Sequence, residues 1–256
     1  MTLQLGVADV GAIEIRNFNG SAVEDFKLVA SEFSYYEDLF VPAVSATVVL
    51  TDATGYLNKF PFVGDEDLRL EFKTRGFDYI EGIDVNLRSF KVGTKARIAD
   101  RAVAYPVYFT TETAINDPKT EVVGFYEGKI DDIVRSISTL NQFELPFAIE
   151  GTDGLYKYVG TGDTVFETIH KLRREALSLT EYKSSAFVFF QDRFGYKFIS
   201  LNSLFAQTPR EGNDYYFTKA NTNLPSGVAP NQIISSFEQI KSNDIIDGMR
   251  HGLYGN

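Results

Sequence analysis

The most informative stretch of the sequence runs Phe33-Ser-Tyr-Tyr-Glu-Asp-Leu-Phe-Val-Pro-Ala-Val-Ser-Ala-Thr-Val-Val-Leu-Thr-Asp-Ala-Thr-Gly55. It joins two strand-like runs through a polar kink that contains a proline. In the second run every second residue is apolar, which is the period of a half-buried β-strand. These apolar positions are Val44, Ala46, Val48 and Leu50. Turn residues close the run from Thr51 to Gly55, so the stretch predicts a piece of barrel wall.

Similar strand patterns fill the surrounding sequence. The segment after the quoted stretch ends in a second alternating strand, with apolar side chains at Leu68, Leu70 and Phe72. The clearer predicted strands are 26–32, 44–50, 68–72, 80–92 and 105–111. Because five or six strands occur without a convincing helix, residues 1–115 are predicted to form an N-terminal β-barrel or sandwich domain.

A different pattern begins after a predicted turn at residues 116–119. Residues 130–137 carry a helical apolar stripe, and Thr164 with Glu167 forms a capping box for a second helix, whose apolar spacing continues to Leu179. A β-hairpin follows, with strands at 186–190 and 196–200, and short strands are expected around Phe147 and over 156–159. Residues 116–230 are therefore predicted to be an α+β middle domain.

Three groups of residues, taken in order along the chain, resemble the baseplate central hub proteins of contractile-tailed phages. This tail hub family is related to the N-terminal half of type VI secretion spike proteins. The first group consists of Asp52, Gly55, Leu57, Pro61, Gly64 and Glu66. The second consists of Phe187, Phe189, Gln191, Asp192, Gly195, Phe198, Ser203 and Leu204. The third is the segment from Ile233 to Gly255, which resembles the entry into a second tube-like domain.

The resemblance implies a β-rich α+β fold in three parts. These are an N-terminal tube-type β-barrel (1–115), an α+β middle domain (116–230) and the beginning of a second tube-like barrel (231–256). Since the sequence stops inside the third part, we expect either a truncated sequence or a member with a reduced second domain.

The resemblance also implies a function, that of a structural virion protein in the tail baseplate. Three copies would form a homotrimeric ring, with the tail tube or distal tail protein on one face and the cell-puncturing spike protein on the other. Baseplate wedge proteins are further expected neighbours, and the ring would leave a channel for DNA ejection. Such a protein is synthesised in the host cytoplasm.

Composition excludes several other classes of protein. The 256 residues contain 35 acidic and 25 basic side chains, a formal net charge of -10, so the summed field repels nucleic acid rather than binding it. A negative channel wall would let a polyanion pass without sticking. The chain has no cysteine and two histidines, which excludes disulfides, thiolate zinc sites and cysteine nucleophiles. The N-terminus does not resemble a signal peptide, and no apolar run is long enough for a transmembrane helix.

No residue pattern predicts a catalytic, cofactor-binding or metal site. The sequence lacks a Gly-x-Ser-x-Gly elbow, and His170 is interpreted as a solvated or interface residue on its helix. The glycines of 151–154 and 160–163 favour a turn and a helix cap over a phosphate loop, because Asp163 would repel phosphate. The acidic pair Asp131 and Asp132 lacks the spacing of a calcium loop and is interpreted as solvated or subunit-contact charge.

Intersubunit or partner contacts are expected at two places. The first is the pair of aromatic residues Tyr35 and Tyr36, taken to be exposed. The second is the acidic turn Asp65, Glu66 and Asp67, taken to be solvated or contact charge. Two alternative functions remain open: a type VI secretion-like spike or effector-loading module, and a tail-associated cell-wall hydrolase. The hydrolase would need paired carboxylates in a pocket, one of them with a raised pKa.

Overall fold

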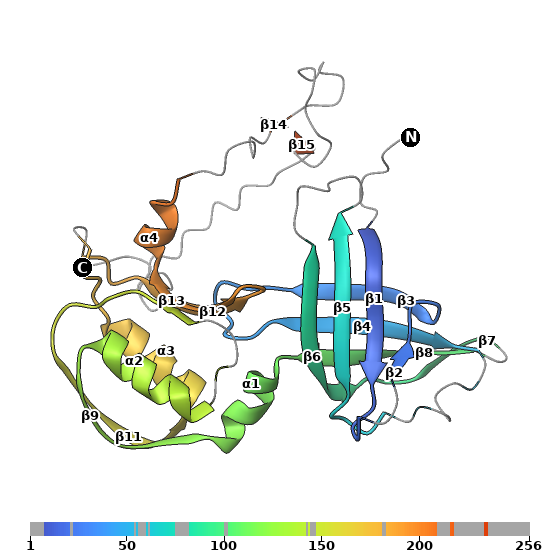
Figure 1. Cartoon of the computed structure of the whole chain (residues 1–256), viewed down its shortest axis with the longest axis horizontal. Helices are drawn as coiled ribbons and strands as arrows, with labels where there is room; N and C mark the ends of the chain where they lie inside the picture. The colour runs from blue at the N-terminus through green and yellow to red at the C-terminus, as the bar shows by residue number, and fades with distance from the viewer. Residues whose placement is uncertain are drawn as a thin grey trace.

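The computed structural model describes residues 8–20, 23–53, 55, 60, 62–74, 82–99, 102–141, 143, 147–180, 183–208, 216–217 and 233–234. These residues form an α+β fold rich in strand, as the sequence predicted. Figure 1 shows a large sheet formed by the N-terminal half and, beside it, helices with smaller sheets. Two hydrophobic clusters of buried residues lie in these two regions.

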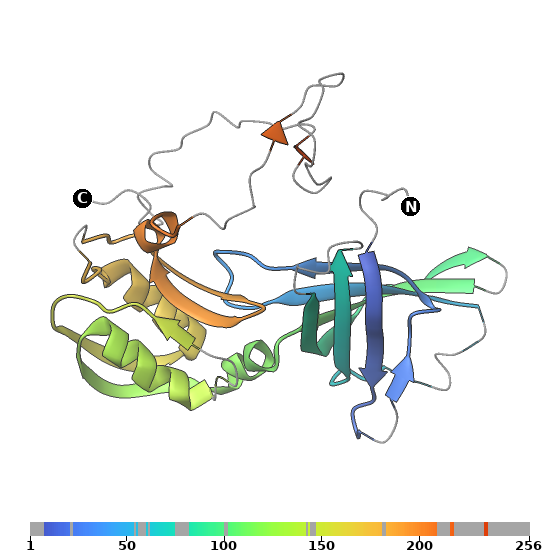
Figure 2. The ribbon, with the colours of Figure 1, turned by 45° about the horizontal axis from the view of Figure 1, so that its top comes forward.

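The large sheet contains the first eight strands, and all its pairings are antiparallel. Its hydrogen-bonded order is β2-β1-β5-β6-β8-β4-β3, with β7 paired to β8. The strands are β1 (Ala8–Arg16), β2 (Val23–Asp25), β3 (Ala30–Tyr36), β4 (Ser45–Asp52), β5 (Asp67–Thr74), β6 (Ile83–Val92), β7 (Ala96–Ala99) and β8 (Ala102–Thr110). Because β2 and β3 stand at opposite ends of the order yet follow each other along the chain, the sheet must curl (Figures 1 and 2). No pairing joins β2 to β3 among the described residues, so a closed tube-type barrel stays a prediction.

Strand β4 confirms the alternation predicted for residues 44–50. Every second side chain of β4 is buried, and Val48 is completely so. On its two sides Val48 lies opposite Phe33 of β3 and Val107 of β8. Burying one side chain of this kind stabilises a fold by about 1.5–3 kcal/mol. The inner face of β4 is therefore a major part of the first hydrophobic cluster.

The strand predicted for residues 26–32 is wrong in its first half. Phe26 is buried and stands at the start of a turn, since its backbone N–H donates to Ile13 O at 2.8 Å and its own carbonyl accepts from Ala30 N at 2.8 Å. Its ring packs edge-on against Phe60, with centroids 5.4 Å apart. The chain thus reverses between β2 and β3, and the new strand begins only at Ala30.

The second region combines four helices with a two-stranded ribbon and a three-stranded sheet. The helices are α1 (Glu112–Asn116), α2 (Ile130–Ser138), α3 (Val165–Glu175) and α4 (Leu201–Phe205), with 3-10 turns η2 (Asp117–Lys119) and η3 (Thr139–Asn141). The strands are β9 (Glu121–Gly128), β10 (Phe147–Ile149), β11 (Tyr156–Thr164), β12 (Phe187–Asp192) and β13 (Gly195–Ser200). β9 pairs with β11, while β13 lies between β12 and a parallel β10.

Two sequence predictions in this region need correction. Residues 116–119 do not form a simple turn: α1 ends there and η2 follows, with Pro118 in its first positions, where a missing N–H donor is tolerated. Strand β9 was not predicted at all. Its apolar residues point to both faces, Val122 inward with 0% exposure and Phe125 outward with 61%, so no alternation marks it.

Helices α2 and α3 confirm the predicted stripes and cap. The apolar stripe of α2 is buried in the second cluster together with Ile169 and Leu172 of α3. The Thr164 hydroxyl accepts from Glu167 N at 3.3 Å, and the Glu167 carboxylate accepts from Thr164 N at 3.1 Å. The expected continuation to Leu179 is wrong, because α3 ends at Glu175 and Leu179 is 59% exposed.

The C-terminal part of the chain contributes the β12–β13 hairpin, which the sequence predicted, and the short helix α4, which it did not. Beyond them, the described residues include two short strands, β14 (Tyr216–Phe217) and β15 (Ile233–Ile234), which pair in parallel. The rest of the predicted second barrel, 231–256, lies outside the described residues. Where the chain is described, no helix has both the length and the apolar character needed to cross a bilayer.

Candidate functional site

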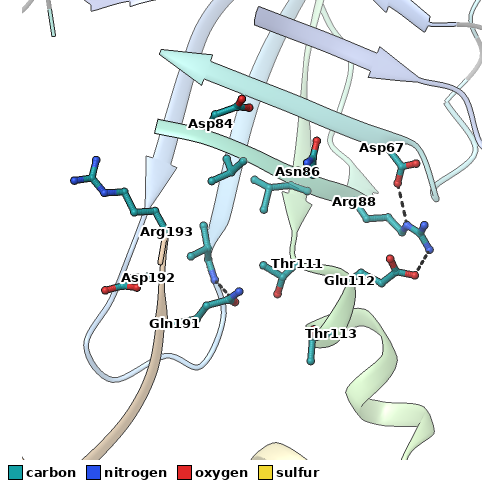
Figure 3. A pocket seen from close by; sticks show the side chains of 13 residues that line it. Asp67, Asp84, Asn86, Arg88, Thr111, Glu112, Thr113, Gln191, Asp192 and Arg193 are labelled. Atoms are coloured by element: carbon teal, nitrogen blue, oxygen red, sulfur yellow. Dashed lines mark hydrogen bonds and ion pairs between the residues drawn. The ribbon is translucent and has the colours of Figure 1, made fainter. Parts of the chain in front are cut away.

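A cleft of about 240 Å³ opens where the large sheet meets the tip of the β12–β13 hairpin (Figure 3). Strand β6 supplies one wall through the run from Asp84 to Arg88. Thr111, Glu112 and Thr113, at the start of α1, form the base, and residues 191–193 of the hairpin form the wall opposite. Both hydrophobic regions therefore contribute to one cleft.

Arg88 is the charged centre of one end of the cleft. Its Nη1 lies 2.9 Å from Glu112 Oε1 and 3.3 Å from Asp65 Oδ1, and its Nε lies 3.2 Å from Asp67 Oδ1. Figure 3 shows the side chain reaching between Asp67 and Glu112. Partial burial acts to lower the Arg88 pKa, but the neighbouring carboxylates outweigh it and leave that pKa raised. Arg88 thus links β6, the acidic turn and α1.

The middle residue of the acidic turn, Glu66, is not a solvated charge. Its side chain has 0% exposure, which contradicts the sequence interpretation. Its carboxylate accepts from Val63 N at 2.7 Å, from Gly64 N at 3.2 Å and from the Ser89 hydroxyl. The Ser89 oxygen in turn accepts from the Asp65 and Glu66 backbone N–H groups. Glu66 is therefore an internal brace of the turn and is not available for a contact between subunits.

The other two acidic residues keep their side chains at the surface. Asp65 is 60% exposed and adopts a positive φ of 113°, and Asp67 is 46% exposed. Both form ion pairs with Arg88. Because Glu66 and Ser89 hold the backbone of this turn, these two carboxylates are presented in a set geometry, and their contact with a partner stays a prediction.

Tyr35 and Tyr36 occupy different environments although they are adjacent. Tyr35 is half-buried, its ring lies 5.8 Å from that of Phe72, and its hydroxyl donates to Glu37 Oε1 at 2.7 Å. Burial and the Glu37 carboxylate raise the Tyr35 pKa above its ordinary value. Tyr36 is 55% exposed. The expectation of two exposed aromatics is therefore correct only for Tyr36.

Two hydrogen bonds connect the hairpin to the loop between β3 and β4. Val44 N donates to Gln191 Oε1 at 3.2 Å, and Arg193 N donates to Glu37 Oε1 at 2.8 Å. Gln191 is 1% exposed, so its bond is shielded from water. In the sequence, Gln191 is marked only by its place in a motif that resembles the hub family, and no pattern marks Glu37. No local pattern indicates a contact between residues 147 positions apart.

The outer face of the sheet beside the cleft is a network of surface charges. Arg69 of β5 contacts Asp84 of β6 at 3.1 Å, Glu71 at 2.8 Å and Glu14 of β1 at 3.7 Å. Hydrogen bonding to Asp84 raises the Arg69 pKa. Exposed pairs of this kind contribute at most about 1 kcal/mol each. The network keeps Asp84 oriented at the rim of the cleft.

His170 differs from its sequence interpretation in the part of the chain that the structure describes. No group of histidine and carboxylate side chains there is arranged to hold a metal ion. Burial, followed by Arg173 and Arg174, lowers the His170 pKa to about 4, and the ring packs against Phe189 at 5.8 Å. His170 is thus partly buried rather than solvated, and the alternative that it is an interface residue stays a prediction.

The glycines of 160–163 lie in strand β11 and not in a turn. A side chain at Gly160 would collide with Val122 O of the neighbouring strand, 2.5 Å from the Cβ position. Asp163 is held by Lys171 at 2.6 Å, which lowers the Asp163 pKa. The predicted helix cap at Thr164 is confirmed. Gly160 is explained by close strand packing and Gly162 by its positive φ of 99°. Asp131 accepts from Thr152 N and Oγ1, so it is partly engaged rather than simply solvated.

Comparison with known proteins finds no matching family model and no matching curated protein. Among solved structures, the chain is similar to the tail protein from Neisseria meningitidis MC58, with 9% identity, a TM-score of 0.46, and coverage of 73% of this chain and 49% of that one. It is also similar to the 43 kDa tail protein of prophage MuSo2 from Shewanella oneidensis (10% identity, TM-score 0.47, coverage 73% and 53%). A third similar structure is the Francisella PdpA-VgrG complex (9% identity, TM-score 0.45, coverage 82% and 32%).

The chain spans about half the length of the two tail proteins that it matches. Likeness at this identity and TM-score assigns neither a family nor a function to the chain. The functional argument therefore rests on its own residues.

Proposed function

We propose that this chain is a structural, non-enzymatic protein of a phage-type tail baseplate. In this proposal it is a central hub of which three copies form a ring. The ring joins the tail tube or distal tail protein to the spike protein and leaves a channel for DNA. The protein would then be located in the virion tail.

The observation that carries the proposal is the open end of the curled sheet. Strands β2 and β3 each pair with only one neighbour among the described residues, so each has an outer edge free for another chain. Exposed apolar side chains lie on these two strands and on the turn between them: Val23 of β2 is 52% exposed, Leu28 of the turn 100%, and Tyr36 of β3 55%. Free edges and exposed apolar groups are liabilities in a monomer. Pairing with another copy in a closed ring would cover both.

Two residues of the motifs that resemble the hub family also have definite structural roles here. Glu66 braces the turn that leads into β5, and Gln191 ties the hairpin to the start of β4. These roles support the proposal because a ring subunit must hold its sheet and its second region in a constant relation while bearing load.

Negative-stain electron microscopy and sedimentation velocity of the purified chain test the proposal. We expect rings with a central opening and a sedimentation coefficient that corresponds to three copies. Leu28→Lys should shift the protein to single subunits without lowering the melting temperature, because the Leu28 side chain makes no buried contact within the subunit.

A matched control is Leu155→Lys, which changes an 82% exposed leucine in the second region. This variant should keep the rings. A chain that stays monomeric at every concentration, or rings that survive Leu28→Lys unchanged, would contradict the proposed use of the β2–β3 end.

A further inference from the structure

Strand β6 has one edge that is paired along only half of its length. On one side it pairs with β5 from Ile83 to Arg88. On the other side it pairs with β8 only from Arg88 to Val92, because β8 ends at Thr110 and the chain turns into α1. Residues 83–87 of β6 thus have no strand beside them on that side among the described residues, and this edge forms a wall of the cleft.

The direction of each backbone group on this edge follows from one hydrogen bond. Ser89 N donates to Glu66 O at 2.8 Å, so the polar backbone groups of Ser89 point toward β5. In an antiparallel ladder this direction alternates from residue to residue. The backbone N–H and C=O groups of Leu87 and Val85 therefore also point toward β5. Those of Asn86 and Asp84 point the other way, into the cleft.

The space beside residues 84–87 continues the place that β8 occupies between β6 and β4, so it has the width of one strand. Its opposite wall is the hairpin tip, where Gln191 is 1% exposed and bonded to Val44. A strand belonging to a folded partner sheet would bring its own neighbours into this wall. A single extended segment, lying in line with β8 and antiparallel to β6, would fit between the two walls.

We propose that the cleft beside residues 84–87 of β6 is a β-augmentation site, which binds an extended segment of a separate partner protein by adding it as a strand. The segment carries alternating apolar and basic side chains. An apolar contact is available on Val85, which is only partly buried, whereas Leu87 is 3% exposed and belongs to the core. The surroundings stay acidic after the existing ion pairs are counted, which favours basic side chains on the other face. Arg88 is shared by Asp65, Asp67 and Glu112, and Arg69 is shared by Glu14, Glu71 and Asp84.

This proposal goes beyond the hub function and does not depend on it, since the site lies within one copy of the chain. Main-chain hydrogen bonds to Asn86 and Asp84 would provide most of the affinity, and the alternate side chains the selectivity. The backbone of Asn86 is thus the decisive group, rather than its side chain.

A fluorescence anisotropy titration tests the site with the whole chain. The probe is a short, labelled synthetic peptide of alternating valine and lysine with blocked ends. The two protein variants are Asn86→Pro, which removes the N–H that points into the cleft, and Asn86→Ala, which keeps it. Proline is compatible with a strand edge whose N–H makes no ladder bond. We expect the original chain and Asn86→Ala to bind the probe equally, and Asn86→Pro to bind about tenfold more weakly.

A second peptide separates strand pairing from simple attraction between opposite charges. It has the same sequence and charge, but its backbone is N-methylated at alternate residues so that it cannot pair. The original chain should bind it at least about tenfold more weakly. The proposal is overturned if the original chain does not bind the unmodified probe, if both peptides bind equally, or if a folded Asn86→Pro binds like Asn86→Ala. The N-methylated peptide decides the question even if Asn86→Pro fails to fold.

Discussion

The backbone N–H of Arg193 donates a 2.8 Å hydrogen bond to the Oε1 atom of Glu37, a residue 156 positions earlier in the chain. The same oxygen accepts the hydroxyl of Tyr35 at 2.7 Å. Glu37 therefore joins the loop between β3 and β4 to the hairpin tip of the second region. Together with the Val44–Gln191 bond, it sets the width of the cleft.

Replacing Glu37 should loosen this connection. We expect Glu37→Ala to lower the free energy of unfolding by about 1 kcal/mol, because two donors lose their acceptor at a site still reached by water. Urea denaturation measures the change. Glu32→Ala, which alters an exposed carboxylate on β3, is the control and should change stability by less than about 0.5 kcal/mol. Equal effects of the two variants would mean that the Glu37 bonds contribute nothing.

The buried carboxylate of Glu66 should be far more important for stability than its exposed neighbour. Glu66→Ala leaves the N–H groups of Val63 and Gly64 without their acceptor, at a cost of about 2–3 kcal/mol. Asp65→Asn removes only a surface ion pair and keeps a residue type that tolerates positive φ, so it should cost at most about 1 kcal/mol. Thermal unfolding of the two variants gives the comparison, and a Glu66→Ala protein as stable as Asp65→Asn would refute the bracing role.

Substitutions of Tyr35 and Tyr36 should have different effects, one on folding and the other on assembly. Tyr36→Ala removes an exposed ring, so we expect weaker ring formation with a melting temperature within a few degrees of the original. Tyr35→Ala removes packing against Phe72 as well as the bond to Glu37, so it should lower the melting temperature of the single subunit. Sedimentation and calorimetry on the same samples distinguish the two effects. A large fall in melting temperature for Tyr36→Ala would count against its role as a contact residue.

His170 should make stability depend on pH. Its folded-state pKa of about 4 lies below the ordinary value of 6.5, so the unfolded chain binds this proton more readily. Stability should therefore fall as the pH is lowered from 6.5 toward 4, by roughly 1–2 kcal/mol after allowance for the partial exposure of the ring.

Removing the imidazole of His170 tests whether this residue causes the predicted fall in stability at low pH. His170→Gln should lose less stability than the original chain between pH 6.5 and 4, as measured by urea denaturation at each pH. His251→Gln removes the other histidine of the chain and is the control, with the original pH dependence expected to remain. Identical pH profiles for the original chain and His170→Gln would show that His170 titrates normally.

Hydrogen exchange can test the free edge of β6 without any ligand. The amide of Leu87 points toward β5 and should exchange slowly, whereas the amide of Asn86 points into the cleft and should exchange much faster. Residue-resolved exchange by NMR measures both in one experiment. Equal protection of the two amides would show that another group already pairs with this edge.

The features that the sequence predicted correctly are those that depend on near neighbours. The buried positions of β4, the apolar stripe of α2 and the cap formed by Thr164 and Glu167 all follow from spacings of two to four residues. Such spacings determine which face of an element is apolar and where a helix can start. The errors arose where this local signal is ambiguous, as at Phe26, whose apolar character suits a buried turn as well as a strand.

The candidate site depended on the tertiary structure. Glu66 looks like any acidic turn residue in the sequence, and only the position of Ser89 on the adjacent strand makes it a buried brace. The cleft likewise exists because β8 turns away at Thr110 while the hairpin that carries Gln191 returns to Val44. Local periodicity in the sequence was enough to predict elements such as β4, α2 and α3, but not β9, whose apolar residues point to both faces. Only the packing of distant segments decided which polar groups are satisfied and which strand edge stays free, because those partners are set by the path of the whole chain.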